Sequence, residues 1–150
     1  MSDNYLKLIP TQPEYSPAGA AQIAARKLLR SVVRESGEVT TKTGAEIEFV
    51  DAGGNFERIT CPNCGEGISN IWWSSSVSQA RQSRFRFLNV VTPCCQTEAS
   101  LNDLEYTWPQ GFARFVLVAK NPGITTVDNE TLERLEELLG CRLRVIWARY

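Results

Sequence analysis

The sequence predicts an α+β fold in which strands and helices alternate around a cysteine-rich insertion. Outside the insertion, four segments carry β-branched or aromatic residues at strand spacing, and two carry apolar residues at helical spacing. Four cysteines lie between the second and third of these strands. A chain of 150 residues is long enough to bury one core, so we expect a single domain over residues 1–150.

The first two elements are expected to be a strand and a helix. Tyr5–Ile9 alternates as a strand does and is followed by a proline-rich loop. Ser16 can cap the free amides of a helix that Pro17 begins. Alanine, leucine and valine then recur at helical spacing until Gly37, which supplies the stop.

The middle of the chain is expected to add strands and a metal-clamped hairpin. Ile47–Val50 and Phe56–Thr60 are predicted strand pieces, separated by a turn with two glycines. Ser69–Ser83 is a polar insert without an assigned element. Arg84–Val91 alternates, so it predicts a strand with its two arginines on one face and its two phenylalanines on the other.

The last third is expected to be a strand, a helix and a strand. Phe112–Ala119 is strongly apolar, and leucines after Asp128 or Asn129 recur at helical spacing up to Gly140. Cys141–Arg149 is the final strand. Without the insertion the order is β-α-β-β-α-β, the ferredoxin-like split βαβ pattern, in which two helices cover one face of a four-stranded antiparallel sheet.

The cysteines have the spacing of a structural zinc site. Cys61 and Cys64 are separated by two residues, so one tight turn can direct both sulfurs at an ion, and Gly65 can adopt the positive φ that such a turn needs. Cys94 and Cys95 follow after a polar interval and complete four thiolates. We expect one structural Zn²⁺ per chain.

The second cysteine pair is irregular. When Thr92–Gln96 is aligned with Cys61–Gly65, Thr92 stands in a ligand position, and Cys94 directly precedes Cys95. Adjacent residues of an extended segment face opposite sides, so both thiols reach one ion only if the backbone turns sharply. The alternatives are three thiolates with another ligand, a redox-active pair or a disulfide between neighbours. The nearest carboxylates for a fourth ligand are Asp51, Glu66 and Glu98.

Composition argues against several functions. The chain has no histidine, which removes Cys–His and Ser–His pairs, and a zinc ion with four thiolates has no open position, so we expect no enzyme. The net charge of −1 disfavours broad nucleic-acid binding. We find no apolar run long enough for a bilayer and no signal-peptide pattern, so a cytoplasmic location is expected.

Two surfaces are candidates for binding a partner. The cysteine insertion combines rings with cations that can stack on bases or contact phosphates, although the rings can equally pack inside. Its residues are Trp72, Trp73, Arg81, Arg84 and Arg86. The first helix carries a stripe of Arg26, Arg30 and Arg34, which is either a solvated face or a ridge for an acidic partner.

The Cys-Pro-Asn-Cys-Gly motif at residues 61–65 resembles the first knuckle of zinc-ribbon proteins, which are metal-clamped hairpins found in transcription factors, ribosomal proteins and adaptors. The resemblance covers residues 58–98, and Thr92 and Cys94 depart from it. The whole chain also resembles small uncharacterised bacterial cytosolic proteins, a resemblance that implies no activity.

Three functions follow from these observations. The first is a non-catalytic zinc-binding protein-interaction module, of the kind found in adaptors and in immunity or antitoxin proteins. The second is a nucleic-acid-binding protein that uses the arginine, phenylalanine and tryptophan residues of the hairpin. The third is a thiol redox sensor, which would release zinc and form disulfides under oxidant.

Overall fold

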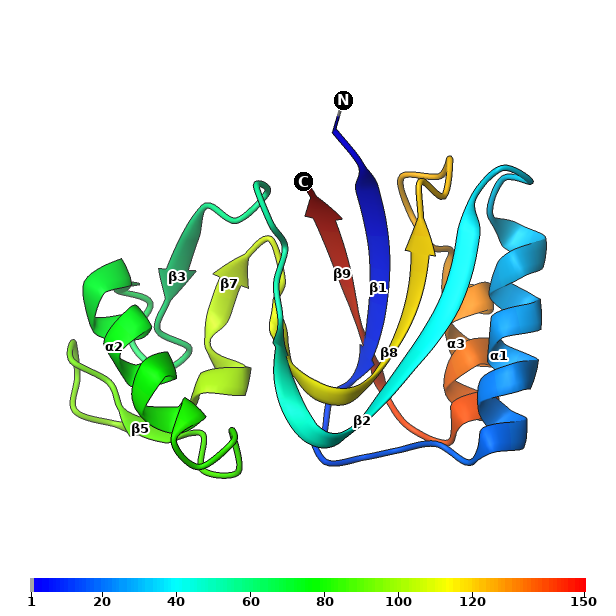
Figure 1. Ribbon diagram of the computed structural model, residues 1–150. Coiled ribbons are helices and arrows are strands. Elements are labelled where there is room, and N and C mark those ends of the chain that lie inside the picture. The colour runs from blue at the N-terminus through cyan, green and yellow to red at the C-terminus, as the bar shows by residue number, and fades with distance from the viewer. Residues whose placement is uncertain (1) are drawn as a thin grey trace.

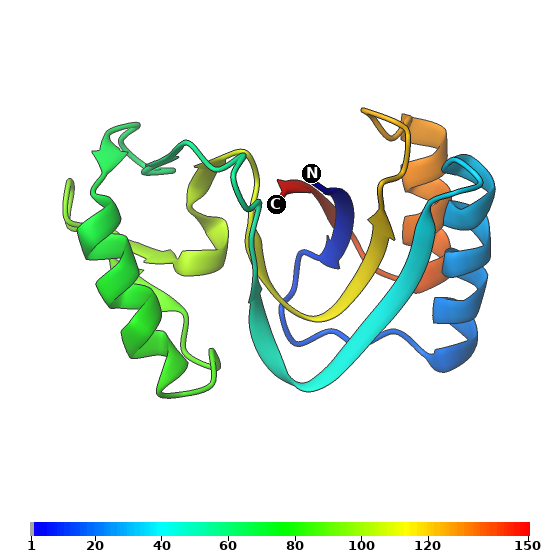
Figure 2. The ribbon, with the colours of Figure 1, turned by 45° about the horizontal axis from the view of Figure 1, so that its top comes forward.

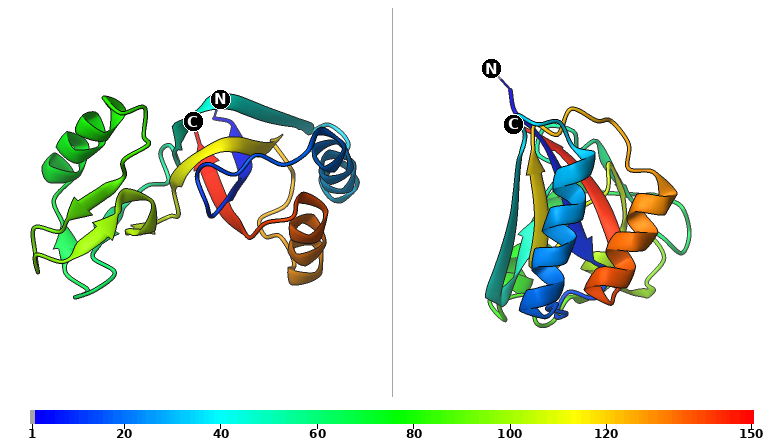
Figure 3. Two further views of the ribbon diagram at one scale, coloured as in Figure 1. Left: turned by 90° about the horizontal axis from the view of Figure 1, so that it is seen from below. Right: turned by 90° about the vertical axis from the view of Figure 1, so that its right-hand side faces the viewer.

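The fold of the chain, as described by a computed structural model over residues 2–150, is α+β (Figure 1). The body is an antiparallel sheet with strand order β2-β8-β1-β9. Helices α1 and α3 lie side by side on one face of this sheet (Figure 3). The elements of the body are β1 (Asn4–Pro10), α1 (Gly19–Val32), β2 (Glu38–Val50), β8 (Gly111–Lys120), α3 (Asn129–Leu139) and β9 (Leu143–Arg149).

The body folds around the apolar face that the sheet presents to its two helices. Leu6 and Leu8 of β1 alternate with half-buried residues and are fully buried against this face. Leu29 of α1 and Leu135 of α3 meet them from the helices. Burying side chains of this size contributes about 1.5–3 kcal/mol each.

The helix ends agree with the sequence prediction only in part. Helix α1 begins at Gly19, two residues beyond Pro17, and no side chain caps it, so the predicted start with Ser16 as the cap is wrong. The helix ends at Val32, so the predicted stop at Gly37 is wrong as well. Asp128 does cap α3, by accepting from the Thr131 amide, and Gly140 ends this helix in the left-handed conformation.

No helix in residues 2–150 has both the length and the apolar character that a bilayer crossing needs.

Residues 51–110 form a second layer of structure, called here the metal lobe, on the far side of the sheet from α1 and α3 (Figures 2 and 3). It contains a three-stranded sheet of order β4-β3-β7 and the two-stranded sheet β5-β6. The elements are β3 (Arg58–Thr60), β4 (Gly67–Ile68), α2 (Asn70–Arg81), β5 (Asn89–Val91), β6 (Glu98–Ser100), η1 (Leu101–Asp103) and β7 (Glu105–Thr107).

Helix α2 occupies the segment that the sequence leaves unassigned. Its first turn is capped by Ser69, whose hydroxyl accepts from the Ile71 amide. Trp73, Val77 and Ala80 recur at helical spacing and pack on the core of the lobe. This stripe was a signal for a helix, but the serines between Trp73 and Val77 obscured it because serine favours caps and turns.

The predicted strand over Arg84–Val91 is wrong for its first half. Arg84 and Phe85 have φ angles of 58° and 61°, because the chain after α2 turns back and the Phe85 amide donates to the Ala80 carbonyl. Only Asn89–Val91 is extended. Phe85 is consequently buried whereas Phe87 is 76% exposed, so the two rings do not share a face.

Two polar junctions fasten the metal lobe to the sheet. In the first, Arg144 of β9 donates to the carbonyls of Asn102 and Gln110 at 2.7 and 2.9 Å. In the second, Asp51 accepts from Tyr150 Oη at 2.8 Å and lies 3.5 Å from Lys7 Nζ. Because these contacts lie where the chain leaves and re-enters the sheet, they orient the lobe.

The second junction makes the free energy of unfolding depend on pH. Burial raises the pKa of Asp51, but the Tyr150 hydroxyl, the Lys7 charge and the Gly53 amide together hold it below 3.8. A carboxyl group with a depressed folded-state pKa stabilises the fold above its unfolded pKa, and this contribution is lost as the pH falls through the folded value.

We therefore expect Asp51→Asn to lower the free energy of unfolding at pH 6 by up to about 1 kcal/mol, a small effect because the side chain is 38% exposed. The difference from the unmodified chain should shrink as the pH falls below 3.8. Urea unfolding at a series of pH values measures it, with Glu57→Gln, an exposed residue, as the control. An equal difference at all pH values would contradict the role of Asp51.

Candidate metal centre

Four cysteine sulfurs meet at one point of the metal lobe. The Sγ atoms of Cys61, Cys64, Cys94 and Cys95 all lie within 4.8 Å of one another. Cys61 Sγ is 3.8 Å from Cys95 Sγ, and Cys64 Sγ is 3.4 Å from Cys94 Sγ. Ligands bound tetrahedrally at about 2.3 Å stand about 3.8 Å apart, so these spacings suit one metal ion. All four thiols are free.

The first pair is held by a turn between β3 and β4. The Cys61 amide donates to the Glu66 carbonyl at 2.8 Å, and the Gly65 amide donates to the Cys61 carbonyl at 3.0 Å. Gly65 has a φ of 78°, a conformation that costs glycine little. The turn brings Cys61 and Cys64 to the same side.

The second pair is held by a turn of the same conformation, which connects β5 to β6. The Thr92 amide donates to the Thr97 carbonyl at 2.9 Å, the Gln96 amide donates to the Thr92 carbonyl at 3.0 Å, and Gln96 has a φ of 56°. Thr92 is thus equivalent to Cys61, Cys95 to Cys64, and Cys94 to Asn63. The cysteine cluster lies between two hairpins, rather than at the base of the single hairpin that the sequence predicts.

Thr92 occupies a ligand position without a sulfur. It is fully buried, and its hydroxyl lies 3.3 Å from Cys95 Sγ. Cys94 supplies the fourth thiol instead, because the turn removes the extended geometry that would direct adjacent side chains to opposite faces. Among residues 2–150, the group that could hold an ion contains these four thiols and no carboxylate.

The surroundings of the cluster favour thiolates at some positions. Hydrogen bonds with the Thr92 and Thr97 hydroxyls and the Asn63 amide lower the pKa of Cys95 to about 5. The Glu66 amide favours the Cys64 thiolate, but the adjoining Cys94, Cys61 and Cys95 sulfurs outweigh it and raise the pKa of Cys64 to about 12. Four thiolates this close need a cation to balance them.

The tryptophans predicted to bind a partner have different surroundings. Trp73 packs in the lobe, with its ring 5.4 Å from Phe49 and its Nε1 donating to Tyr106 Oη at 3.0 Å. Trp72 is half-buried and lines a groove between α2 and β5. The packing alternative therefore accounts for Trp73, and the surface role of Trp72 stays a prediction.

The arginines that were predicted to bind a partner also differ in their surroundings. Arg84 pairs with Glu46 at 2.9 Å, and Arg81 lies 5.7 Å from the centre of the Phe85 ring. Arg86 is exposed, and neither it nor Arg81 forms an ion pair within the described chain. These two cations remain available on the surface of the lobe.

Of the arginine stripe predicted on the first helix, Arg34 lies beyond the end of α1 at Val32, and the stripe mostly serves the fold. Arg30 donates to the carbonyls of Arg34, Glu35 and Gly37 and so closes the loop after the helix. Arg34 Nε donates to the Asn121 carbonyl at 2.9 Å. Arg26 is exposed. The ridge for an acidic partner stays a prediction, with less of it free than the sequence indicated.

Comparison with protein-family models, with curated proteins and with solved structures gave no match. The chemistry of the site is therefore the basis for interpreting it. Cys141, the remaining cysteine, packs against the helix-covered core of the body and lies outside the cluster.

The equivalence of the two turns makes a testable prediction. The double change Thr92→Cys with Cys94→Asn should keep four thiols around the metal, because position 92 already directs its side chain at the cluster. Cys94→Asn alone should leave three thiols and weaken metal retention against a chelator. Metal content after dialysis with a chelator measures both. If the double variant retains no more metal than the single variant, the equivalence is wrong.

Proposed function

We propose that this chain is a non-catalytic protein-interaction module whose metal lobe is held by one structural zinc ion. The observation that carries the proposal is the convergence of four sulfurs from two hairpins at tetrahedral spacing. Zinc suits a tetrahedral set of four thiolates, and a closed set of this kind serves structure. Such sites contribute on the order of 10–16 kcal/mol of apparent binding free energy in small modules.

The architecture supports two finer assignments. The strand order β2-β8-β1-β9, with α1 and α3 on one face, supports a ferredoxin-like split βαβ body. Two hairpins with equivalent turns, separated by α2, support a zinc-ribbon-like insertion over residues 58–98. In this proposal the ion joins two hairpins whose strands are too short to be stable alone.

An interaction role is favoured over catalysis by what the zinc ion can do. A zinc ion with four thiolates has no position for water or substrate, and the sequence has no histidine to serve as a general base. We propose a cytoplasmic partner protein, in keeping with an adaptor or an immunity or antitoxin protein. Nucleic acid is the second candidate, because Arg86, which forms no ion pair in the described chain, lines a hollow with the exposed ring of Phe87.

The zinc assignment predicts a contrast between cysteines. Cys61→Ser should lose the bound zinc, whereas Cys141→Ser should keep one ion per chain, because Cys141 lies outside the cluster. Elemental analysis of the purified proteins measures this contrast. Equal zinc content in the two variants, or iron in place of zinc, would contradict the assignment.

The interaction role is tested by native mass spectrometry of the tagged chain purified from its own host at low and moderate salt. A zinc-loaded complex with a defined stoichiometry of another protein, retained at moderate salt, is the expected result. Co-purifying nucleic acid that is lost as salt rises would favour the second candidate, because such affinity depends on phosphate contacts. Zinc loss with disulfide formation during mild oxidation, coupled to loss of the partner, would favour the redox sensor.

A further inference from the structure

We propose that the groove between α2 and β5 binds an extended segment of the partner protein, which adds to β5 as a strand and places an acidic side chain near Arg86. This inference rests on the proposed interaction function and assigns its binding site. Three features carry it: an unpaired strand edge, a groove beside that edge, and the distribution of charge around the groove.

The first feature is the open edge of β5. Among residues 2–150, β5 pairs with β6 alone. The Leu101 amide donates to the Leu88 carbonyl, and the Thr92 amide donates to the Thr97 carbonyl. Hydrogen-bonded pairs alternate along an antiparallel ladder, so the amide and carbonyl groups of Asn89 and Val91 point away from β6. An added strand would satisfy them.

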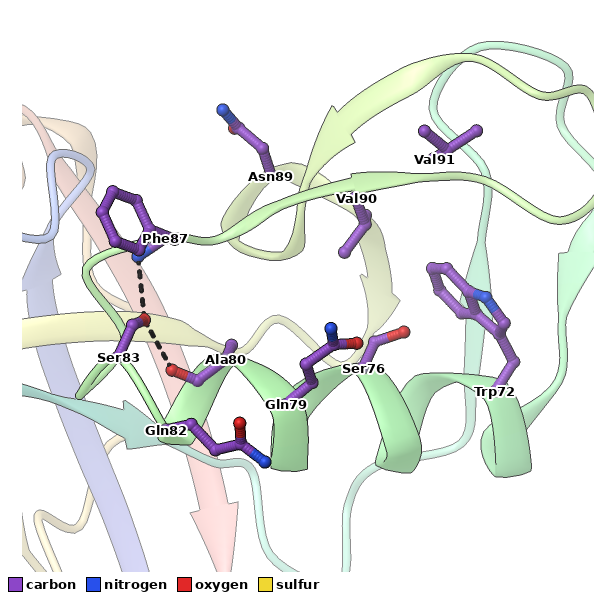
Figure 4. A pocket seen from close by; sticks show the side chains of 10 residues that line it. All are labelled: Trp72, Ser76, Gln79, Ala80, Gln82, Ser83, Phe87, Asn89, Val90 and Val91. Carbon is purple, nitrogen blue, oxygen red and sulfur yellow. Dashed lines mark hydrogen bonds between the residues drawn. The ribbon is translucent and has the colours of Figure 1, made fainter.

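The second feature is the groove itself, about 720 Å³ in volume (Figure 4). All three residues of β5 line it, and Val90 points toward α2 whereas Asn89 and Val91 point away. A strand added at the open edge would likewise direct every second side chain toward α2. Those side chains would meet a wall made by Trp72, Ser76, Gln79, Ala80, Gln82 and Ser83.

The third feature is charge. The groove has no charged lining residue, so it suits apolar and small polar side chains. A neighbouring hollow, which shares Gln82, Ser83 and Phe87 with the groove, is lined by Arg84 and Arg86. Glu46 pairs with Arg84, which leaves Arg86 to attract an acidic side chain at this end.

These features favour an extended polypeptide over a single nucleic-acid strand. A nucleic acid needs cations along the whole path of its backbone, whereas here they lie at one end. Unpaired amide and carbonyl groups in register are what an added peptide strand binds, with alternate side chains giving specificity.

The test uses Val91→Pro. Proline at this position removes an amide that faces away from β6, so the β5-β6 ladder and the metal site should remain. Val91→Thr is the matched control, because it keeps the amide and the β-branched shape. Zinc content and thermal unfolding establish that both variants fold like the unmodified chain.

The probe is a displayed library of random peptides of about ten residues, long enough to span the groove in extended form. It is selected on the zinc-loaded full-length chain. We expect selected peptides to carry Asp or Glu at one end and alternating apolar residues. Their affinity should fall about tenfold or more on Val91→Pro, fall on Arg86→Glu, and stay unchanged on Val91→Thr.

Three results would overturn the groove assignment: no selected peptide, selected peptides that bind Val91→Pro undiminished, or displacement of bound peptide by an oligothymidylate at moderate salt. These results are distinct from failure of the proposed function. If the partner found in the host binds the Val91→Pro variant as well as the unmodified chain, the interaction role stands and only the groove is wrong.

Discussion

The metal lobe depends on the meeting of two hairpins at one set of four sulfurs. Its strands are two or three residues long, far too short to be stable as isolated hairpins. The turn between β3 and β4 and the turn between β5 and β6 each contribute two thiols, so an ion bound there joins two sheets that share no hydrogen-bonded strands. The link acts together with the apolar core of the lobe, which joins residues of both hairpins to α2.

The proposed binding groove depends on the same link. Helix α2 joins the first turn to the second, so fixing both turns fixes the distance between α2 and β5 across the groove. On its inner side the lobe continues into the body, because Phe112 of β8 lies 5.1 Å from Phe49 and 5.2 Å from Phe85, measured between ring centres. The long strands β2 and β8 therefore serve two cores, one under the helices and one in the lobe. This arrangement leaves the groove on the outer surface, where a partner can reach it.

The sequence predicted the α+β class and the cysteine cluster because both depend on local patterns. Apolar periodicity identified the helices and strands of the body, although it found only Ile47–Val50 of β2 (Glu38–Val50), and the spacing of Cys61 and Cys64 is sufficient for a metal-binding turn. Periodicity did not identify α2, because serines interrupt its apolar stripe. It also missed the turn at Arg84 and Phe85, where non-glycine residues adopt positive φ. The internal bonding of Arg30 and the burial of Trp73 also depend on contacts between distant segments, which periodicity does not report.

In the proposed function, a zinc ion at the four thiols holds the metal lobe, whereas the body is held by its own core. Amide hydrogen exchange of the zinc-loaded protein, compared with the same protein after chelation, tests this most directly. The amides of Ile59, Ile68 and Val77 should lose protection after chelation, whereas those of Leu8 and Leu117 should keep it. Unchanged protection in the lobe after removal of the metal would show that the ion does not hold it.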